Sequence, residues 1–291
     1  MRIKFEARTE FSKGVLLSVP LITILISVTV SSFILLALGK SPMMTMYSFF
    51  IAPFETFYSV TEIFLKFGPL LIISQALAIG FRAKVWNIGA EGQMVMGAIA
   101  ATAIPVYFPD STSFLLLPAM IILGAVGGMV WSGIAAFLKT QFNANEILVT
   151  LMLSSIAYQF LYYLLLGPWK DPMGFNFPQT VMFQDEALFT SLFTGVRFNT
   201  SIFLPILFTL GVWIIMEKSF IGFKLVAGGT APKAAGYAGF SAKTAVWQSL
   251  LLAGFAAGIA GMSEVAGPIG QLQRSVTSGY GYSAIIVAFL G

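Results

Sequence analysis

Long stretches without a charged side chain recur along this sequence, for example at residues 15–38 and 114–138. An α-helix needs roughly 20 apolar residues to cross the hydrocarbon of a bilayer. Only helices and closed barrels can satisfy their backbone hydrogen bonds there. The chain is 57% hydrophobic and only 10% charged, whereas about 25% of the residues in a soluble domain are charged. We therefore expect an all-α, polytopic integral membrane protein.

The apolar runs predict about seven complete transmembrane helices, a truncated eighth, and one transmembrane domain over residues 1–291. The last apolar run, 283–291, is too short to span a bilayer, so we expect further helices in the complete protein. Residues 39–66 are expected outside the membrane, with an interfacial helix at 45–57. The predicted complete crossings are residues 15–38, 69–81, 94–108, 114–138, 147–166, 203–216 and 245–262.

Small residues are frequent within the run 114–138, and they let membrane helices approach each other closely. We expect them to pack against another helix rather than to contact a ligand. They are Gly124, Gly127, Gly128, Ser132 and Gly133.

Lysine and arginine residues indicate the orientation, because cytoplasmic loops carry an excess of both. With the N-terminus inside, most of the 16 Lys and Arg residues fall on the predicted inside segments 1–14, 82–84, 139–146 and 217–244. We therefore predict a cytoplasmic N-terminal segment at 1–14. The net charge of +4 follows from this bias and does not indicate nucleic-acid binding.

The sequence excludes several kinds of chemistry, because it contains neither Cys nor His. A thiol nucleophile, a disulfide, a His-based metal site and a Ser-His-Asp triad are ruled out. The sequence does not match the phosphate-binding pattern G-x-x-x-x-G-K-[ST], and the predicted spans carry no paired acid–base constellation. We therefore expect no enzyme activity, no metal and no cofactor on this chain. If ATP drives the protein, a partner subunit binds the ATP and Mg²⁺.

Residues 82–98 (RAKVWNIGAEGQMVMGA) place polar side chains where the chain is expected to cross the bilayer. Such groups are costly at that depth unless they face a cavity or another helix. Short, glycine-interrupted apolar segments are also typical of the broken helices of transporters, and residues 267–282 are a candidate counterpart in the other half. The predicted substrate-pathway residues are Asn87, Gly89, Glu91, Gly92 and Gln93 from the first stretch, with Gly279 and Gly281 from the second.

A purely structural role for the same side chains is the alternative. If residues 88–108 form one helix, Asn87 caps it and Glu91 lies near its N-terminus, where a carboxylate offsets the helix dipole. Neither side chain then touches cargo. Asn87 and Gln93 would otherwise suit a neutral polar cargo, since amides both donate and accept hydrogen bonds. Both interpretations stay open at this point.

Five segments of the sequence carry a common pattern. They are WNIGAEGQMVMGA at 86–98, NEILVTLML at 145–153, GPWKDP at 167–172 with FPQT at 177–180, IGFKLVAGGTAPKAAGYAGFSAK at 221–243, and SGYGYSAIIVAFLG at 278–291. Together they resemble permease subunits of bacterial ABC importers for nucleosides and simple sugars, which are similar to branched-chain amino acid permeases. The likeness runs in order from about residue 39 to the last residue.

The resemblance implies a type II-like ABC importer permease with discontinuous helices, in the inner (cytoplasmic) membrane of a bacterial cell. Permeases of this kind pair with a second permease subunit, giving a homodimer or a heterodimer. They bind two ABC ATPase subunits on the cytoplasmic side. They accept cargo from an extracytoplasmic substrate-binding protein.

The resemblance also implies that the cytoplasmic loop 217–244 couples the permease to the ATPase. Pro232 is expected to begin a short helix there, whose small residues would fit a groove on the partner. Gly236 stands where the family often has Arg, which puts one charge contact with the ATPase in doubt. A plain connector is the alternative to a coupling role. The implied coupling residues are Lys233, Ala234, Ala235, Gly236, Tyr237 and Gly239.

The function that we expect is nucleoside import by alternating access, driven by ATP hydrolysis on the partner. Nucleosides are favoured because residues 167–172 and 177–180 resemble the nucleoside branch, and simple sugars such as ribose are the near alternative. An ion-coupled secondary transporter is a further alternative. That class usually needs a relay of buried carboxylates or His, whereas only Glu91 and Glu264 are expected at membrane depth.

Overall fold

The computed structural model describes residues 13–290, whose backbone forms helices, turns and loops with two isolated β-bridges. The chain divides into two compact units, Met1–Val60 and Thr61–Gly291. Six helical segments of the described residues are long and apolar enough to cross a membrane. They are Ser18–Ala37, Phe57–Arg82, Leu116–Phe142, Glu146–Leu166, Thr200–Lys218 and Ala242–Ile269. The predicted all-α, multi-pass membrane fold is confirmed.

The first unit consists of α1 (Lys13–Ala37), α2 (Pro42–Phe50) and a 3₁₀ turn, η1 (Ala52–Phe54). Ser41 accepts a hydrogen bond from the backbone N–H of Met44 (3.4 Å) and so caps α2, with a proline in the first turn. The predicted interfacial helix at 45–57 was wrong in its bounds. A proline inside η1 lacks the N–H that would continue α2, so the helix ends before it.

The second unit begins within α3 (Phe57–Arg82), which is longer than the predicted crossing at 69–81. Pro69 lies inside this helix rather than at its start, and membrane helices tolerate such prolines where neighbours satisfy the freed backbone. After α3 the chain turns through Lys84, whose φ is +56°, and α4 (Ala90–Tyr107) follows. α4 is the predicted third crossing, and its polar N-terminal turn keeps it outside the six most apolar spans.

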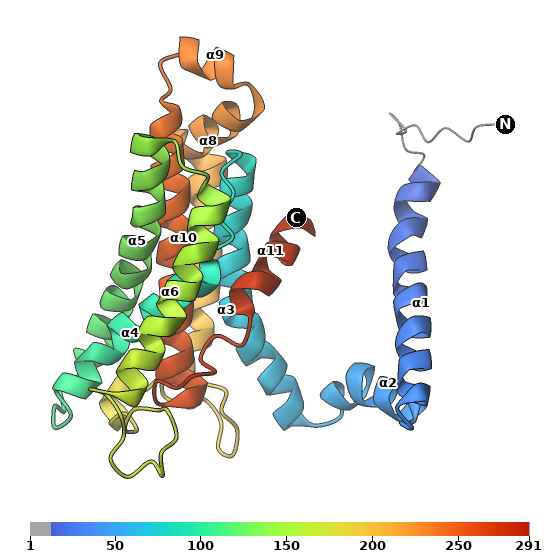
Figure 1. The fold of residues 1–291 in the computed structure, drawn as a ribbon, viewed down its shortest axis with the longest axis vertical. Coiled ribbons are helices and arrows are strands. Elements are labelled where there is room, and N and C mark those ends of the chain that lie inside the picture. Colours follow the sequence, from blue (N-terminus) through green and yellow to red (C-terminus); the bar gives the residue numbers. More distant parts are fainter. Residues whose placement is uncertain (1–12, 291) are drawn as a thin grey trace. The chain divides into compact units, whose positions relative to one another are not determined.

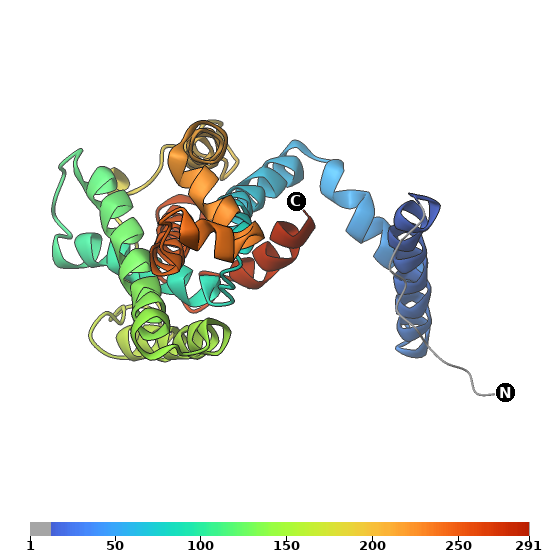
Figure 2. The same cartoon turned by 90° about the horizontal axis from the view of Figure 1, so that it is seen from above.

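α10 (Ala242–Glu264) lies at the centre of the second unit, with α4 and α5 (Leu116–Phe142) packed against it (Figures 1 and 2). Glycines allow the close approach of α5. A Cβ atom on Gly258 would lie 2.1 Å from the carbonyl oxygen of Gly124, and one on Gly254 would lie 2.4 Å from that of Gly128. The predicted packing role of the small residues in 114–138 is confirmed for these glycines.

Three segments complete this bundle. α6 (Glu146–Leu166) packs against α4 and is capped by the Asn145 side chain. A 3₁₀ turn, η3 (Thr200–Ile202), leads into α7 (Phe203–Trp213), which ends in a π turn, η4 (Ile214–Lys218). α10 likewise ends in a π turn, η5 (Val265–Ile269), and after an irregular segment α11 (Tyr280–Leu290) packs on α3, α4 and α10.

The long segment 167–199 folds onto the bundle at the end opposite α9. Its backbone pairs with the irregular segment after α10: Thr180 donates to the carbonyl of Leu272 (2.9 Å) and Phe183 to that of Gly270 (2.9 Å). A short 3₁₀ turn, η2 (Asp185–Ala187), lies within it. We call the end of the second unit that carries segment 167–199 the loop end, and we call the opposite end the α9 end.

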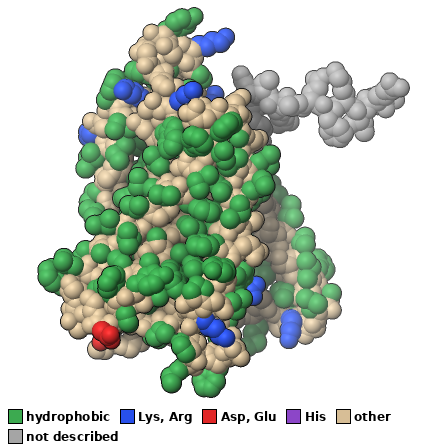
Figure 3. All heavy atoms as spheres, turned by 60° about the vertical axis from the view of Figure 1, so that its left-hand side comes forward, with side chains coloured by type: hydrophobic (Ala, Val, Ile, Leu, Met, Phe, Trp, Pro, Cys, Tyr) green, Lys and Arg blue, Asp and Glu red, His purple; other side chains and the backbone are tan. Residues whose placement is uncertain are grey.

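The two ends differ from the middle in surface chemistry. On the face drawn in Figure 3, hydrophobic side chains cover the middle of the second unit, and several Lys and Arg side chains gather at the top, the α9 end. Charged ends around an apolar middle are typical of a chain that crosses a bilayer.

Candidate functional site

The N-terminal turn of α4 is held by a pair of amide side chains. Asn87 Nδ2 donates to Gln93 Oε1 (2.9 Å), and Gln93 Nε2 donates back to Asn87 Oδ1 (3.1 Å). Asn87 Oδ1 also accepts the backbone N–H of Gly89 (3.0 Å). Both side chains are buried. The two amides therefore satisfy each other in this structure.

The alternative in which Asn87 caps a helix over residues 88–108 was wrong about the cap, although Glu91 does lie in the first turn. α4 begins at Ala90, with Gly89 as its N-cap residue, rather than at residue 88 with Asn87 as the cap. Asn87 lies two residues before the N-cap, and its side-chain oxygen accepts from the backbone N–H of Gly89 and from Gln93 Nε2 instead of from a helical backbone N–H.

Gly89 and Gly92 let α4 touch α6. A Cβ atom on Gly89 would lie 2.4 Å from the carbonyl oxygen of Thr150, and one on Gly92 would lie 2.4 Å from the Cα atom of Ser154. The backbone N–H of Gly92 donates to Ser154 Oγ (3.3 Å), and that of Ile88 donates to Thr150 Oγ1 (3.2 Å). A larger residue at either glycine would separate the two helices.

Glu91 joins three segments that are far apart in the sequence. Its carboxylate is 0% exposed and accepts hydrogen bonds from Tyr158 Oη of α6 (2.8 Å) and from the backbone N–H groups of Gly279 (2.9 Å) and Gly281 (2.5 Å). Tyr158 Oη also shares a hydrogen bond with Thr277 Oγ1 (2.6 Å). The carboxylate thus lies at the N-termini of both α4 and α11, where the helix dipoles favour negative charge.

The structure brings the two predicted polar stretches together, because Gly279 and Gly281 bond directly to Glu91. Five of the seven predicted pathway residues, Gly89, Glu91, Gly92, Gly279 and Gly281, hold α4, α6 and α11 against one another in this structure. The other two, Asn87 and Gln93, bond to each other. Contact of these residues with cargo stays a prediction.

Sequence reasoning missed the hydroxyl groups of α6 that face this site. Thr150, Ser154 and Tyr158 all bond to the start of α4 or to Glu91. Their spacing of four residues is the signal that places side chains on one face of a helix. Within an otherwise apolar run, that spacing could have identified them.

At the α9 end, the predicted coupling loop forms two helices, α8 (Phe220–Thr230) and α9 (Pro232–Tyr237). α9 has a proline at its start, as predicted, and Gly239 after it has a φ of +80°, which favours glycine. Tyr237 is 94% exposed, whereas Ala235 is buried. Lys233, Ala234, Gly236 and Gly239 are exposed.

Aromatic rings and a lysine hold the α8–α9 hairpin together. The ring of Phe240 meets those of Phe220 and Phe223 edge-on, with centroids 5.8 and 6.1 Å apart. The Nζ atom of Lys224 lies 4.5 Å from the ring centroid of Phe220. These contacts give the exposed α9 a fixed support.

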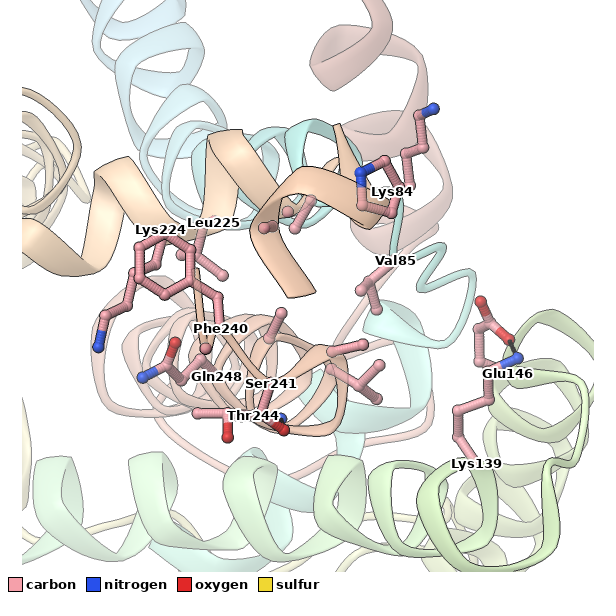
Figure 4. Close-up of a pocket in the computed structure, with 18 residues that line it drawn as sticks. Lys84, Val85, Lys139, Glu146, Lys224, Leu225, Phe240, Ser241, Thr244 and Gln248 are labelled. Carbon is pink, nitrogen blue, oxygen red and sulfur yellow. Dashed lines mark hydrogen bonds and ion pairs between the residues drawn. The ribbon is translucent and has the colours of Figure 1, made fainter. Parts of the chain in front are cut away.

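A pocket of about 390 Å³ lies between this hairpin and the turns that precede α4 and α6 (Figure 4). Lys84 and Val85 line it from the first turn, and the ion pair between Lys139 and Glu146 (2.9 Å) lies at one side. The buried Ala235 lines it from α9. All three loops that the charge pattern predicted on one side of the membrane thus meet at this pocket.

A comparison with known protein families matches residues 59–291 to the family described as "Branched-chain amino acid transport system / permease component". The chain is 30% identical to the glucose ABC transporter permease protein TsgB13 of Haloferax volcanii, over 100% of this chain and 79% of the relative. No solved structure gives a significant match.

Two further relatives are similar over 94% of the chain. One is the guanosine ABC transporter permease protein NupP of Bacillus subtilis, at 30% identity over 79% of its length. The other is the nucleoside ABC transporter permease protein NupB of Lactococcus lactis, at 28% identity over 77% of its length. The family match covers most of the described fold, from α3 to α11. The chain therefore belongs to the permease-component family of branched-chain amino acid transport systems, together with these ABC transporter permeases.

Proposed function

We propose that this chain is the transmembrane permease subunit of an ATP-driven importer that carries nucleosides, with simple sugars as the second candidate. The observation that carries the proposal is its likeness, along nearly its whole length, to permeases named for guanosine, nucleosides and glucose. The two guanosine and nucleoside relatives favour nucleosides, and the glucose relative favours sugars. All three kinds of cargo are neutral and carry several hydroxyl groups.

The α9 end is the proposed contact with the ATPase subunits, on the cytoplasmic side of the inner membrane. α9 follows directly on α8, and α8 packs on the turn before α4, since a Cβ atom on Gly229 would lie 1.9 Å from the carbonyl oxygen of Arg82. Pressure on α9 would therefore reach that turn. α4 and α6 also carry the Glu91 contacts. In the proposed mechanism, closure of the ATPases re-packs these helices and opens the pathway inward. A second permease subunit and an extracytoplasmic binding protein complete the proposed complex.

Uptake of labelled cargo tests the proposal. We would compare cells with the complete importer, cells lacking the permease, and cells with a catalytically inactive ATPase partner. Labelled guanosine, uridine and glucose are the probes. Loss of nucleoside uptake in both deficient strains, insensitive to excess unlabelled glucose, is the expected result.

Loss of glucose uptake alone would move the protein to the sugar branch. Uptake that persists with the inactive ATPase would contradict the ATP-driven mechanism and favour a secondary transporter. If no probe depended on the permease, the proposal of nucleoside or sugar cargo would fail.

A further inference from the structure

A carboxylate, a phenol and an ammonium group meet where α3, α10 and α11 pack together. Glu264 is the last residue of α10, Tyr280 is the first of α11, and Lys66 comes from α3. The Lys66 Nζ atom lies 3.7 Å from Glu264 Oε2 and 5.3 Å from the ring centroid of Tyr280. We call these three residues the Glu264 cluster.

Two polar atoms of the Glu264 cluster are buried without a well-formed hydrogen bond. Glu264 is 1% exposed and Tyr280 is 8% exposed. The two side chains lie close enough to interact with each other, yet neither Glu264 Oε2 nor Tyr280 Oη reaches a partner at good hydrogen-bond geometry within the described part of the chain. The distance from Lys66 to Glu264 is that of an ion pair and too long for a hydrogen bond. Buried polar groups are nearly always paired, so two buried atoms without a well-formed hydrogen bond, beside one cation, call for a further partner.

A neighbouring ion pair shows the contrast. Glu62 accepts hydrogen bonds on both carboxylate oxygens from the guanidinium group of Arg197, one of them from Nε (3.1 Å). Arg197 also donates to the carbonyl oxygen of Pro268 (3.5 Å). This pair is satisfied by the protein alone, which is the ordinary structural arrangement.

The open atoms of the Glu264 cluster match the chemistry of a hydroxyl group. A hydroxyl can donate to the free carboxylate oxygen and accept from the ammonium or the phenol at the same time. Two adjacent hydroxyls can use all three groups. A metal cation is disfavoured because the Lys66 ammonium lies against the carboxylate, and an anion is disfavoured by that carboxylate. The side chain of Lys66 is half exposed and that of Glu264 is 1% exposed, so the ammonium end of the cluster is the part that reaches the surface in this structure.

We propose that the Glu264 cluster binds vicinal hydroxyl groups of the cargo as it enters the permease. This inference rests on the proposed function, since nucleosides and simple sugars both carry such pairs. The inference also requires the cluster to lie toward the loop end of the second unit, which is the end that the proposed orientation places outside. The sugar, rather than the base, is the part of a nucleoside that this subsite would recognise.

The test is transport of cargo with and without the hydroxyl pair by the whole importer. Labelled guanosine and 2′,3′-dideoxyguanosine are compared at concentrations that saturate the binding protein. For the sugar alternative, D-glucose is compared with 1,5-anhydro-3-deoxy-D-glucitol, which lacks every vicinal hydroxyl pair. The variants are Glu264→Gln and Tyr280→Phe, both close in shape to the native residue. Glu62→Gln is the matched control, because it alters an acid of the same region that is already paired. The ratio of maximal rates for the two cargoes does not depend on how much permease reaches the membrane.

We expect the wild type and the control to prefer the cargo with the hydroxyl pair, and each cluster variant to lose about tenfold of that preference. A parallel loss for both cargoes would indicate a purely structural role and overturn the inference. An unchanged ratio in the variants, or a wild type without preference, would overturn it too and leave the proposed function intact. A wild type that carries none of the probes would instead refute the proposed function, and the inference with it.

Discussion

At the scale of single residues, Glu91 is where the start of α4, the middle of α6 and the start of α11 meet. A buried carboxylate is stable only when its oxygens accept hydrogen bonds, and this one accepts three from the protein. Two come from backbone N–H groups at a helix N-terminus, which among the natural residues only proline would remove. The side chain therefore acts as a fixed anchor for α11 in this structure.

Replacing Glu91 with Gln turns one acceptor oxygen into an N–H₂ group, which then faces a donor. We expect a cost of about 1–3 kcal/mol for that unsatisfied contact, seen as a lower melting temperature of the detergent-purified protein. Tyr158→Phe removes only one of the three donors and should lower the melting temperature less. Glu186→Gln, at an exposed acid of the loop end, is the control and should leave it unchanged. Equal melting temperatures for the Glu91→Gln variant and the wild type would contradict the anchoring role of Glu91.

Which polar residues lie at membrane depth could be predicted from the sequence, because an apolar chain makes each of them conspicuous. Their partners could not. The contact between Glu91 and Gly279 joins residues 188 positions apart, and no local pattern indicates such a pairing. The same holds for Lys66 and Glu264, since the sequence placed Lys66 in an outside segment.

At the scale of elements, α9 was predictable because its signals are local. A proline begins it and a glycine with positive φ follows it. The start of α3 was not predictable in that way, because Pro69 gives the same local signal inside a helix. Only packing of that helix against α10 and α11 distinguishes the two cases.

The exposed face of α9 should carry the contact with the ATPase subunits. We expect Tyr237→Ala to reduce co-purification of the ATPase and to lower cargo-stimulated ATP hydrolysis about tenfold, because large exposed aromatic side chains dominate interfaces. Phe175→Ala is the matched control, since Phe175 is 93% exposed at the loop end. Normal ATPase recovery and stimulation with Tyr237→Ala would favour the plain connector.

At the scale of the whole molecule, the predicted alternation of loops agrees with the structure of the second unit. The segments before α4, before α6 and around α9 line one pocket, while segments 108–115 and 167–199 meet at the other end, where Gln184 Nε2 donates to the carbonyl of Phe108 (3.0 Å). The charge bias and the span lengths suffice to predict which loops share an end, because they constrain each crossing separately. The predicted cytoplasmic segment 1–14 lies outside the described residues except for its last two positions.

Thiol labelling can test the orientation directly, since the native chain has no Cys and each variant then carries a single thiol. In intact cells, a membrane-impermeant maleimide should label Phe175→Cys, at the loop end. It should label Ala234→Cys, on α9, only after the membrane is opened. The reverse pattern would invert the proposed orientation and with it the side on which the ATPases bind.

The distance in sequence between Glu91 and its partners also bears on how the chain is made. At roughly 5–20 residues per second, the ribosome reaches Gly279 about 10–40 s after Glu91. During that interval the carboxylate has none of its α11 donors, and lipid alone would be a poor solvent for it. The start of α4 must therefore stay beside water or another protein, and it reaches its final depth only when α11 has been made.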